Sequence, residues 1–170
     1  AALSAIFPDA RFIKLVRNPL DTVPSFLHLM AVGLGVFCDP PDPYVFNEDF
    51  MALLRYEYLT PVEFFKNSPQ RCQFLQYEDL VRHVDRVVAQ LYEGLELDLS
   101  SDFQALLTQT AKAERSYNSN HDYSLEEIGL TEAEIYTAFE EVFALYSFDD
   151  RGFGAGNLNK GPSVKTAKAI

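Results

Sequence analysis

One stretch decides the fold: FPDARFIKLVRNPLDTVPS, residues 7–25. Residues 11–16 form an apolar run typical of a short buried strand, and a well-marked helix start follows directly. Asn18 is a good N-cap, and Pro19 suits the first helical position, where its missing N–H costs nothing. The stretch therefore predicts a strand that delivers Arg17 to the N-terminus of a helix.

The predicted junction of strand and helix is suited to an anion. A helix N-terminus offers unpaired backbone N–H groups, and ligands of α/β folds gather at the carboxyl ends of strands. Arg17 adds a full charge and a planar fork of donors that fits phosphate. Ser25 lies about two turns into the helix, and Pro24 favours a bend that turns the Ser25 hydroxyl toward the same anion. The alternative is that Arg17 caps a surface and Ser25 faces solvent.

Composition limits the classes of function that the chain can have. Its 170 residues, 48% of them hydrophobic, suffice for one packed domain. A net charge of −11 disfavours a nucleic-acid binder, which needs a broad basic face, so any anion must be bound locally. We find no run of about 18 apolar residues and no leader pattern, and we expect a cytoplasmic protein without a membrane span. Cys38 and Cys72 have no metal or redox spacing.

The chain continues with a loop and a helix. Residues 30–44 contain two glycines and a proline-rich run, which favour a loop. Residues 46–68 favour a helix that breaks at Pro61 and has an apolar stripe. The predicted stripe consists of Phe46, Phe50, Leu53 and Leu54.

A second strand and further helices follow. Residues 71–77 alternate as a strand does, and Asp79 is expected to N-cap an amphipathic helix that runs to Leu95. Residues 103–111 favour another helix. Ser124 and Thr131 each open a capping box, which predicts two more helix starts. The last helix is expected to bury Ile135, Phe139, Val142, Phe143 and Tyr146. The alternation of strands and helices indicates an α/β fold with a parallel sheet.

Three segments resemble the sulfotransferase family. In that family, the 3'-phosphate of 3'-phosphoadenosine 5'-phosphosulfate (PAPS) is held by an Arg at the end of a strand and by a Ser eight residues later. Residues 7–25 resemble this segment. The segment YEDL, residues 77–80, resembles one whose Tyr lies near the nucleotide. The run HDYSLEEIGLT, residues 121–131, resembles the HxYSLEExGLT element of a mainly bacterial-type branch. The resemblance implies Arg17 and Ser25 as 3'-phosphate ligands, with Tyr77 beside the nucleotide.

The resemblance covers about residues 7–148 and implies a partial domain. The expected fold is α/β, a P-loop-NTPase-like three-layer domain with a parallel sheet flanked by helices but without its N-terminal P-loop unit. Residues 1–150 then form the C-terminal part of a sulfotransferase domain, and residues 151–170 form a flexible basic tail. Cytosolic members also grip the 3'-phosphate with an Arg-Lys-Gly loop. This chain lacks that tripeptide, and Arg115 and Ser116 are the candidates in its place.

The implied activity is transfer of a sulfuryl group from PAPS to a hydroxyl or amine of a small molecule, glycan or peptide. That chemistry needs a loop that neutralises the phosphosulfate and a base that deprotonates the acceptor. Neither is found upstream of Phe7, so the catalytic residues stay unassigned and the chain alone is expected to be inactive. The alternatives are a non-catalytic remnant that binds nucleotide or another protein, and a relative of P-loop kinases.

Overall fold

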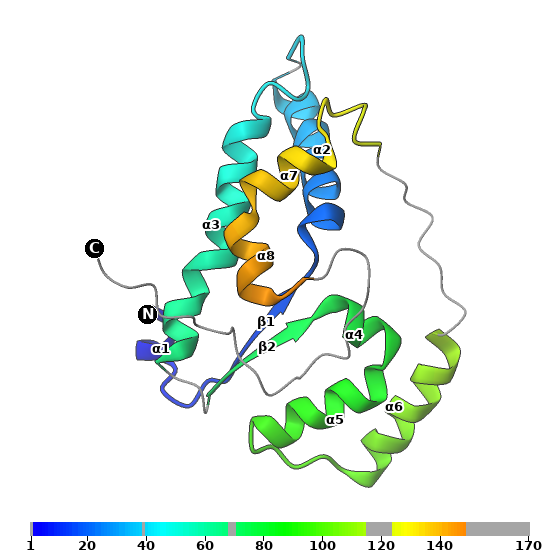
Figure 1. The fold of residues 1–170 in the computed structure, drawn as a ribbon. Helices are drawn as coiled ribbons and strands as arrows, with labels where there is room; N and C mark the ends of the chain where they lie inside the picture. The colour runs from blue at the N-terminus through cyan, green and yellow to red at the C-terminus, as the bar shows by residue number, and fades with distance from the viewer. Residues whose placement is uncertain (1, 39, 68–70, 115–123, 149–170) are drawn as a thin grey trace. The chain divides into compact units, whose positions relative to one another are not determined.

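The computed structural model describes residues 2–38, 40–67, 71–114 and 124–148 (Figure 1). These residues divide into two compact units. The first contains the chain up to Arg17 together with the described residues from Pro61 to Glu114. The second contains Asn18–Thr60 and the described residues from Ser124 onward.

The first unit is built on a parallel pair of strands. β1 (Phe12–Val16) pairs with β2 (Cys72–Gln76), in a register that runs from Phe12 opposite Cys72 to Val16 opposite Gln76. Both strands consist mainly of apolar residues, and each begins one residue later than the sequence predicts. The predicted parallel sheet is therefore confirmed.

Helices flank this sheet. The end of α3 (Asn47–Lys66) places Phe64 edge-on to Phe12, with 5.2 Å between ring centroids, and Phe65 is 4.5 Å from Phe74. α5 (Val84–Gly94) lies beside β2, and the two elements line a cavity of about 270 Å³. The α/β class, with helices flanking a parallel sheet, is confirmed.

The prediction of a fully buried first strand is only half right. Val16 is buried, but Ile13 and Leu15 keep 49% and 44% of their surfaces exposed. Successive side chains of a strand point to opposite faces, so these two share one face of β1. No part of the described chain covers that face fully.

The helices after β2 differ from the prediction. α4 (Tyr77–Arg82) starts at Tyr77, so Asp79 lies inside the first turn, where its carboxylate suits the helix dipole, and is not the N-cap. His83 then leaves the helical conformation, with φ of −140°, and separates α4 from α5. The predicted amphipathic pattern is nevertheless confirmed, because Val87 and Leu95 are almost completely buried. α6 (Ser101–Glu114) is longer than the predicted helix, and α1 (Ala2–Ile6) was not predicted.

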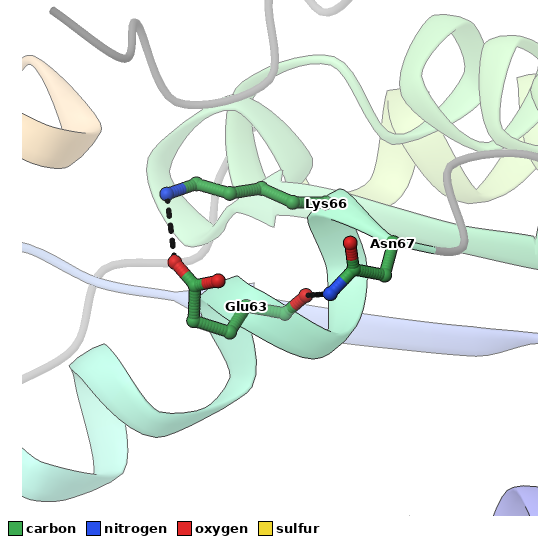
Figure 2. A network of polar contacts seen from close by, with 3 residues as sticks. All are labelled: Glu63, Lys66 and Asn67. Atoms are coloured by element: carbon green, nitrogen blue, oxygen red, sulfur yellow. Dashed lines mark hydrogen bonds and ion pairs between the residues drawn. The ribbon is translucent and has the colours of Figure 1, made fainter. Parts of the chain in front are cut away.

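Side-chain contacts define the end of α3 (Figure 2). The side-chain amide of Asn67 donates to the backbone carbonyl of Glu63 over 2.9 Å, and the Lys66 ammonium lies 3.1 Å from the Glu63 carboxylate. The last carbonyls of a helix have no intrahelical partner, so Asn67 satisfies one of them. The helix passes through Pro61 without the predicted break.

The second unit is helical, and α2 (Pro19–Phe37) opens it. Asn18 caps α2 as predicted, since its side-chain oxygen accepts from the Leu20 N–H over 2.9 Å. The predicted loop from Met30 is wrong up to Phe37, because α2 continues through both glycines. Each glycine destabilises a helix by only about 1 kcal/mol relative to alanine, and the neighbouring Leu, Met and Ala residues favour the helical conformation. The proline-rich run that follows then prevents its continuation.

Three helices besides α2 contribute to the core of the second unit. α7 (Glu132–Ala138) and α8 (Glu140–Tyr146) contribute the predicted stripe, in which Ile135, Phe139 and Val142 have no exposed surface and Tyr146 is buried, whereas Phe143 is only half-buried. The prediction of one last helix is wrong, because the helix is interrupted at Phe139. α3 contributes Tyr58 to this core, whereas the predicted stripe from Phe46 to Leu54 is not buried.

The two predicted capping boxes have different outcomes. At Thr131 the box is complete: its hydroxyl accepts from the Glu134 N–H over 3.3 Å, and the Glu134 carboxylate accepts from the Thr131 N–H over 2.8 Å. At Ser124 only a long contact from the Glu127 N–H, 3.4 Å, is present. Residues 125–129 form turns and no helix, because Gly129 takes a positive φ of 68°, outside the helical range.

Among the described residues, α2 is the helix that is long and apolar enough to cross a membrane by length and composition. A core helix of a soluble protein passes the same test, and α2 buries Val23, Leu27 and Ala31. One such helix is weak evidence, and a membrane span is not established.

Candidate functional site

Arg17 and Tyr77 lie together at the carboxyl ends of the two strands. Val16 and Gln76 are opposite each other in the register, so the residues that follow them emerge at the same end of the sheet. The guanidinium carbon of Arg17 lies 4.8 Å from the centroid of the Tyr77 ring. A cation over an aromatic face is attracted by the ring quadrupole. The structure therefore brings two of the predicted nucleotide-binding residues into contact.

This stacking leaves Arg17 suited to bind an anion. Arg17 is exposed, and Tyr77 keeps 37% of its surface exposed. A guanidinium carries five N–H donors in a planar fork, and two of them match the spacing of phosphate oxygens. The ring also restricts the rotamers of the long side chain, which lowers the entropy lost when a ligand binds.

The other arginines close to the strands have structural contacts. The Nε of Arg11 donates to the carbonyl of Leu95 over 2.7 Å, and the Nε of Arg71 donates to the carbonyl of Ala10 over 2.9 Å. These bonds satisfy backbone acceptors at the end of α5 and before β1, as partly buried carbonyls require. Arg17 directly precedes Asn18, the N-cap of α2.

The N-terminus of α2 differs from the prediction. The N–H of Leu20 is bonded to the side chain of Asn18, and the N–H groups of Asp21 and Thr22 both donate to its carbonyl over 3.0 Å. Pro19 has no N–H. The predicted set of unpaired backbone donors is therefore wrong, because Asn18 accepts from the whole first turn with its side chain and its carbonyl. An anion at this end of α2 depends on side-chain donors and on the helix dipole.

Ser25 lies in α2, two turns after the N-cap, and is half-buried. It belongs to the second unit, whereas Arg17 belongs to the first. Their joint binding of one phosphate stays a prediction from the sequence. Arg115 and Ser116 lie outside the described residues, so their predicted roles also stay predictions.

Two residues that the sequence reasoning missed are connected to the N-terminus of α2. The hydroxyl of Tyr58 donates to the hydroxyl of Thr22 over 3.1 Å, and that hydroxyl donates to the carbonyl of Asn18 over 3.1 Å. A Thr four residues after an N-cap is a known local signal, because Thr hydroxyls bond the carbonyl four residues back. Tyr58 has no local signal of this kind, since its partner is distant in the sequence.

The described residues offer no group of His, Cys, Asp and Glu side chains that could hold a metal. Cys72 is buried, and burial raises the pKa of its thiol, an effect that the neighbouring Arg71 partly offsets. A thiol with a raised pKa stays protonated at neutral pH and is a poor nucleophile.

Comparisons with known proteins agree with this arrangement. The family model described as "Sulfotransferase family" matches residues 1–101. The structure is similar to the crystal structure of the sulfotransferase STF9 from Mycobacterium avium, with a TM-score of 0.69 and 24% sequence identity. The similarity covers 87% of this chain and 38% of that one, so the chain spans well under half the length of that relative. No curated protein matches the sequence significantly.

These matches bear on the alternatives that the sequence left open. At 24% identity the likeness to the solved structure shows the fold, whereas the family match covers more than half of the chain. The family match disfavours the alternative that the chain is a relative of P-loop kinases. Membership of the bacterial-type branch stays a prediction. The chain belongs to the sulfotransferase family.

Proposed function

We propose that this chain supplies the 3'-phosphate-binding part of a PAPS-dependent sulfotransferase that transfers a sulfuryl group to a hydroxyl or amine acceptor. The contact between Arg17 and Tyr77 carries the proposal, because it brings a cation suited to phosphate and a partly exposed aromatic ring together at the strand ends. Ligands of α/β sheets bind at this edge. Family membership supports sulfuryl transfer as the reaction class.

Each side chain has a separate role in this proposal. Arg17 donates to the 3'-phosphate through the edge of its guanidinium, and Ser25 donates one further hydrogen bond. Tyr77 holds the Arg17 side chain and presents its ring beside the nucleotide. PAPS supplies the sulfuryl group when it is bound, and none of the described residues is assigned as the base.

Substitution of Arg17 tests this assignment. In the full-length protein, calorimetry with adenosine 3',5'-bisphosphate and adenosine 5'-monophosphate measures how much the 3'-phosphate contributes to affinity. We expect Arg17→Ala to weaken bisphosphate binding by about tenfold to a hundredfold, because a charge-assisted bond to phosphate is lost, and to change monophosphate binding little. Ser25→Ala loses one neutral hydrogen bond and should weaken bisphosphate binding by about twofold to tenfold.

The matched control is Arg86→Ala on α5. It removes the same charge from an exposed position in the same unit. We expect this variant to bind both nucleotides as the parent does, apart from a small screened effect of net charge. If Arg17→Ala binds both nucleotides with the affinities of the parent, the assignment of the 3'-phosphate site is wrong.

A binding protein without transferase activity is the second candidate. The likeness to the solved sulfotransferase covers only 38% of that chain, and we assign binding roles but no base among the described residues. Radiolabelled sulfuryl transfer from PAPS to phenolic and amine acceptors discriminates between the two candidates. Nucleotide binding that depends on Arg17, without transfer to any acceptor, would favour the binding protein.

A further inference from the structure

A chain of hydrogen bonds links α3 to the N-cap of α2 within the second unit. The Tyr58 hydroxyl donates to Thr22 Oγ1, and Thr22 Oγ1 donates to the Asn18 carbonyl, both over 3.1 Å. Thr22 Oγ1 thus donates one hydrogen bond and accepts another, which uses its single donor and one of its two acceptor positions. The first turn of α2 is therefore attached to a second helix through a side chain.

Pro24 explains why this turn needs an attachment. Proline has no N–H, so the Leu20 carbonyl cannot receive the bond that a helix normally makes from the residue four positions on. The turn that carries Ser25 lacks this bond and is easier to distort than a regular turn. The contact between Tyr58 and Thr22 lies on the turn directly before it.

Tyr58 is itself held firmly. Only 5% of its surface is exposed. Its ring is nearly perpendicular to that of Phe139, with 6.2 Å between centroids. A side chain fixed on several sides loses little rotamer entropy when it makes a further contact, so it is a rigid anchor.

Thr22 and Ser25 are three residues apart in α2, and residues at this spacing lie on the same helix face. We propose that Tyr58, acting through Thr22, is a positioning residue that holds Ser25 in the orientation in which it binds the 3'-phosphate. This inference rests on the proposed function and extends it to two residues that do not touch the ligand. Tyr58 acts through the helix and not by contact with the nucleotide.

The test uses the ratio of affinities for adenosine 3',5'-bisphosphate and adenosine 5'-monophosphate in the full-length protein. We expect Tyr58→Phe and Thr22→Val each to lower this ratio by about twofold, and by no more than Ser25→Ala does. Thr22→Ser keeps the hydroxyl and should retain the ratio of the parent. A ratio in Thr22→Ser as low as in Thr22→Val would contradict a role for the hydroxyl.

Tyr146→Phe is the control for lost stability. It also removes one hydroxyl from a buried tyrosine of the same core, but its hydrogen bond ends at the Tyr58 backbone and does not reach α2. We expect a lower melting temperature with an unchanged affinity ratio. A ratio lowered as much by Tyr146→Phe as by Tyr58→Phe would show that the ratio follows stability, and the positioning role would be rejected.

A double-mutant cycle gives the decisive measurement. If Tyr58 acts through Ser25, then adding Tyr58→Phe to Ser25→Ala should not lower the ratio further, because coupled residues are not additive. Additive losses would contradict the inference. The proposed function is judged separately: a loss in Arg17→Ala without any in Tyr58→Phe and Thr22→Val rejects the positioning role alone, and a parent without preference for the bisphosphate rejects both.

Discussion

Arg17 and Tyr77 are stacked, with 4.8 Å between the guanidinium carbon and the ring centroid, although 60 residues separate them in the chain. The parallel register of β1 and β2 is what makes them neighbours, since the last paired residues are Val16 and Gln76. The strand ends therefore determine the orientation of the cation.

Tyr77→Ala should weaken binding of adenosine 3',5'-bisphosphate by about twofold to fivefold. The substitution removes a cation–π contact worth about 0.5–1 kcal/mol at an exposed site, and Arg17 then samples more rotamers. Tyr77→Phe keeps the ring face and should bind within about twofold of the parent. Calorimetry on both variants measures the difference, and equal affinities for Tyr77→Ala and the parent would show that the stacking does not contribute.

Phe139→Ala should destabilise the second unit by about 3–5 kcal/mol, because a fully buried ring leaves a cavity. Phe139→Leu fills most of that volume and should cost clearly less. Denaturant unfolding followed by circular dichroism gives both free energies. A loss below about 1 kcal/mol for Phe139→Ala would mean that this core collapses around the gap or is not packed as described.

The capping box at Thr131 predicts a loss of stability in acid. Hydrogen bonds from the Thr131 side chain and backbone lower the pKa of Glu134 below its ordinary value of 4.5. A carboxylate with a lowered folded-state pKa stabilises the fold above its unfolded-state pKa, and this contribution is lost as pH falls through the folded-state pKa. The parent should therefore melt above Glu134→Gln at pH 7, and the difference should shrink below pH 4.5. Exposed Glu126→Gln is the control, and an unchanged difference at low pH would contradict the box.

Tyr146 predicts a complementary loss of stability in alkali. Burial, and secondly the neighbouring Tyr58, raise the pKa of its hydroxyl above the ordinary value of 10.0. A group with a raised folded-state pKa contributes stability that is fully present below its unfolded-state pKa and is lost as pH rises. Tyr146→Phe should cost about 0.5–1.5 kcal/mol near pH 7. Denaturant unfolding at pH 8 and at pH 11 should show a smaller difference from the parent at the higher pH, and a difference that grows would contradict the contact.

The sequence predicts well those features that depend on neighbouring residues. The Asn18 cap, the Thr131 box and the strand before Arg17 are local patterns, and the structure contains all three. Errors arise where the surroundings outweigh the preference of a single residue. α2 passes Gly33 and Gly35 because the helix-favouring residues around them offset about 1 kcal/mol for each glycine, and α3 passes Pro61 between the buried side chains of Tyr58 and Phe65.

The site residues also differ in how far the sequence predicts them. Arg17 and Tyr77 follow strands whose ends the sequence indicates, and the carboxyl ends of parallel strands lie at the same edge of a sheet, so their proximity could be predicted. The contact between Tyr58 and Thr22 joins two helices over 36 residues, and no periodicity specifies which face of one helix meets the other. Contacts between side chains of this kind can be identified only from a three-dimensional structure.

The register of the sheet also sets the order of events as the chain folds. Phe12 can pair with Cys72 only after the whole intervening segment has been synthesised and brought back, which is a costly closure of a long loop. Contacts between distant residues form slowly, whereas helices form within microseconds. β1, which carries the half-exposed Ile13 and Leu15, therefore has no paired strand until the ribosome has synthesised β2. During that interval an unpaired apolar strand is available to bind other chains, so this step makes the yield of folded protein sensitive to synthesis rate and to chaperones.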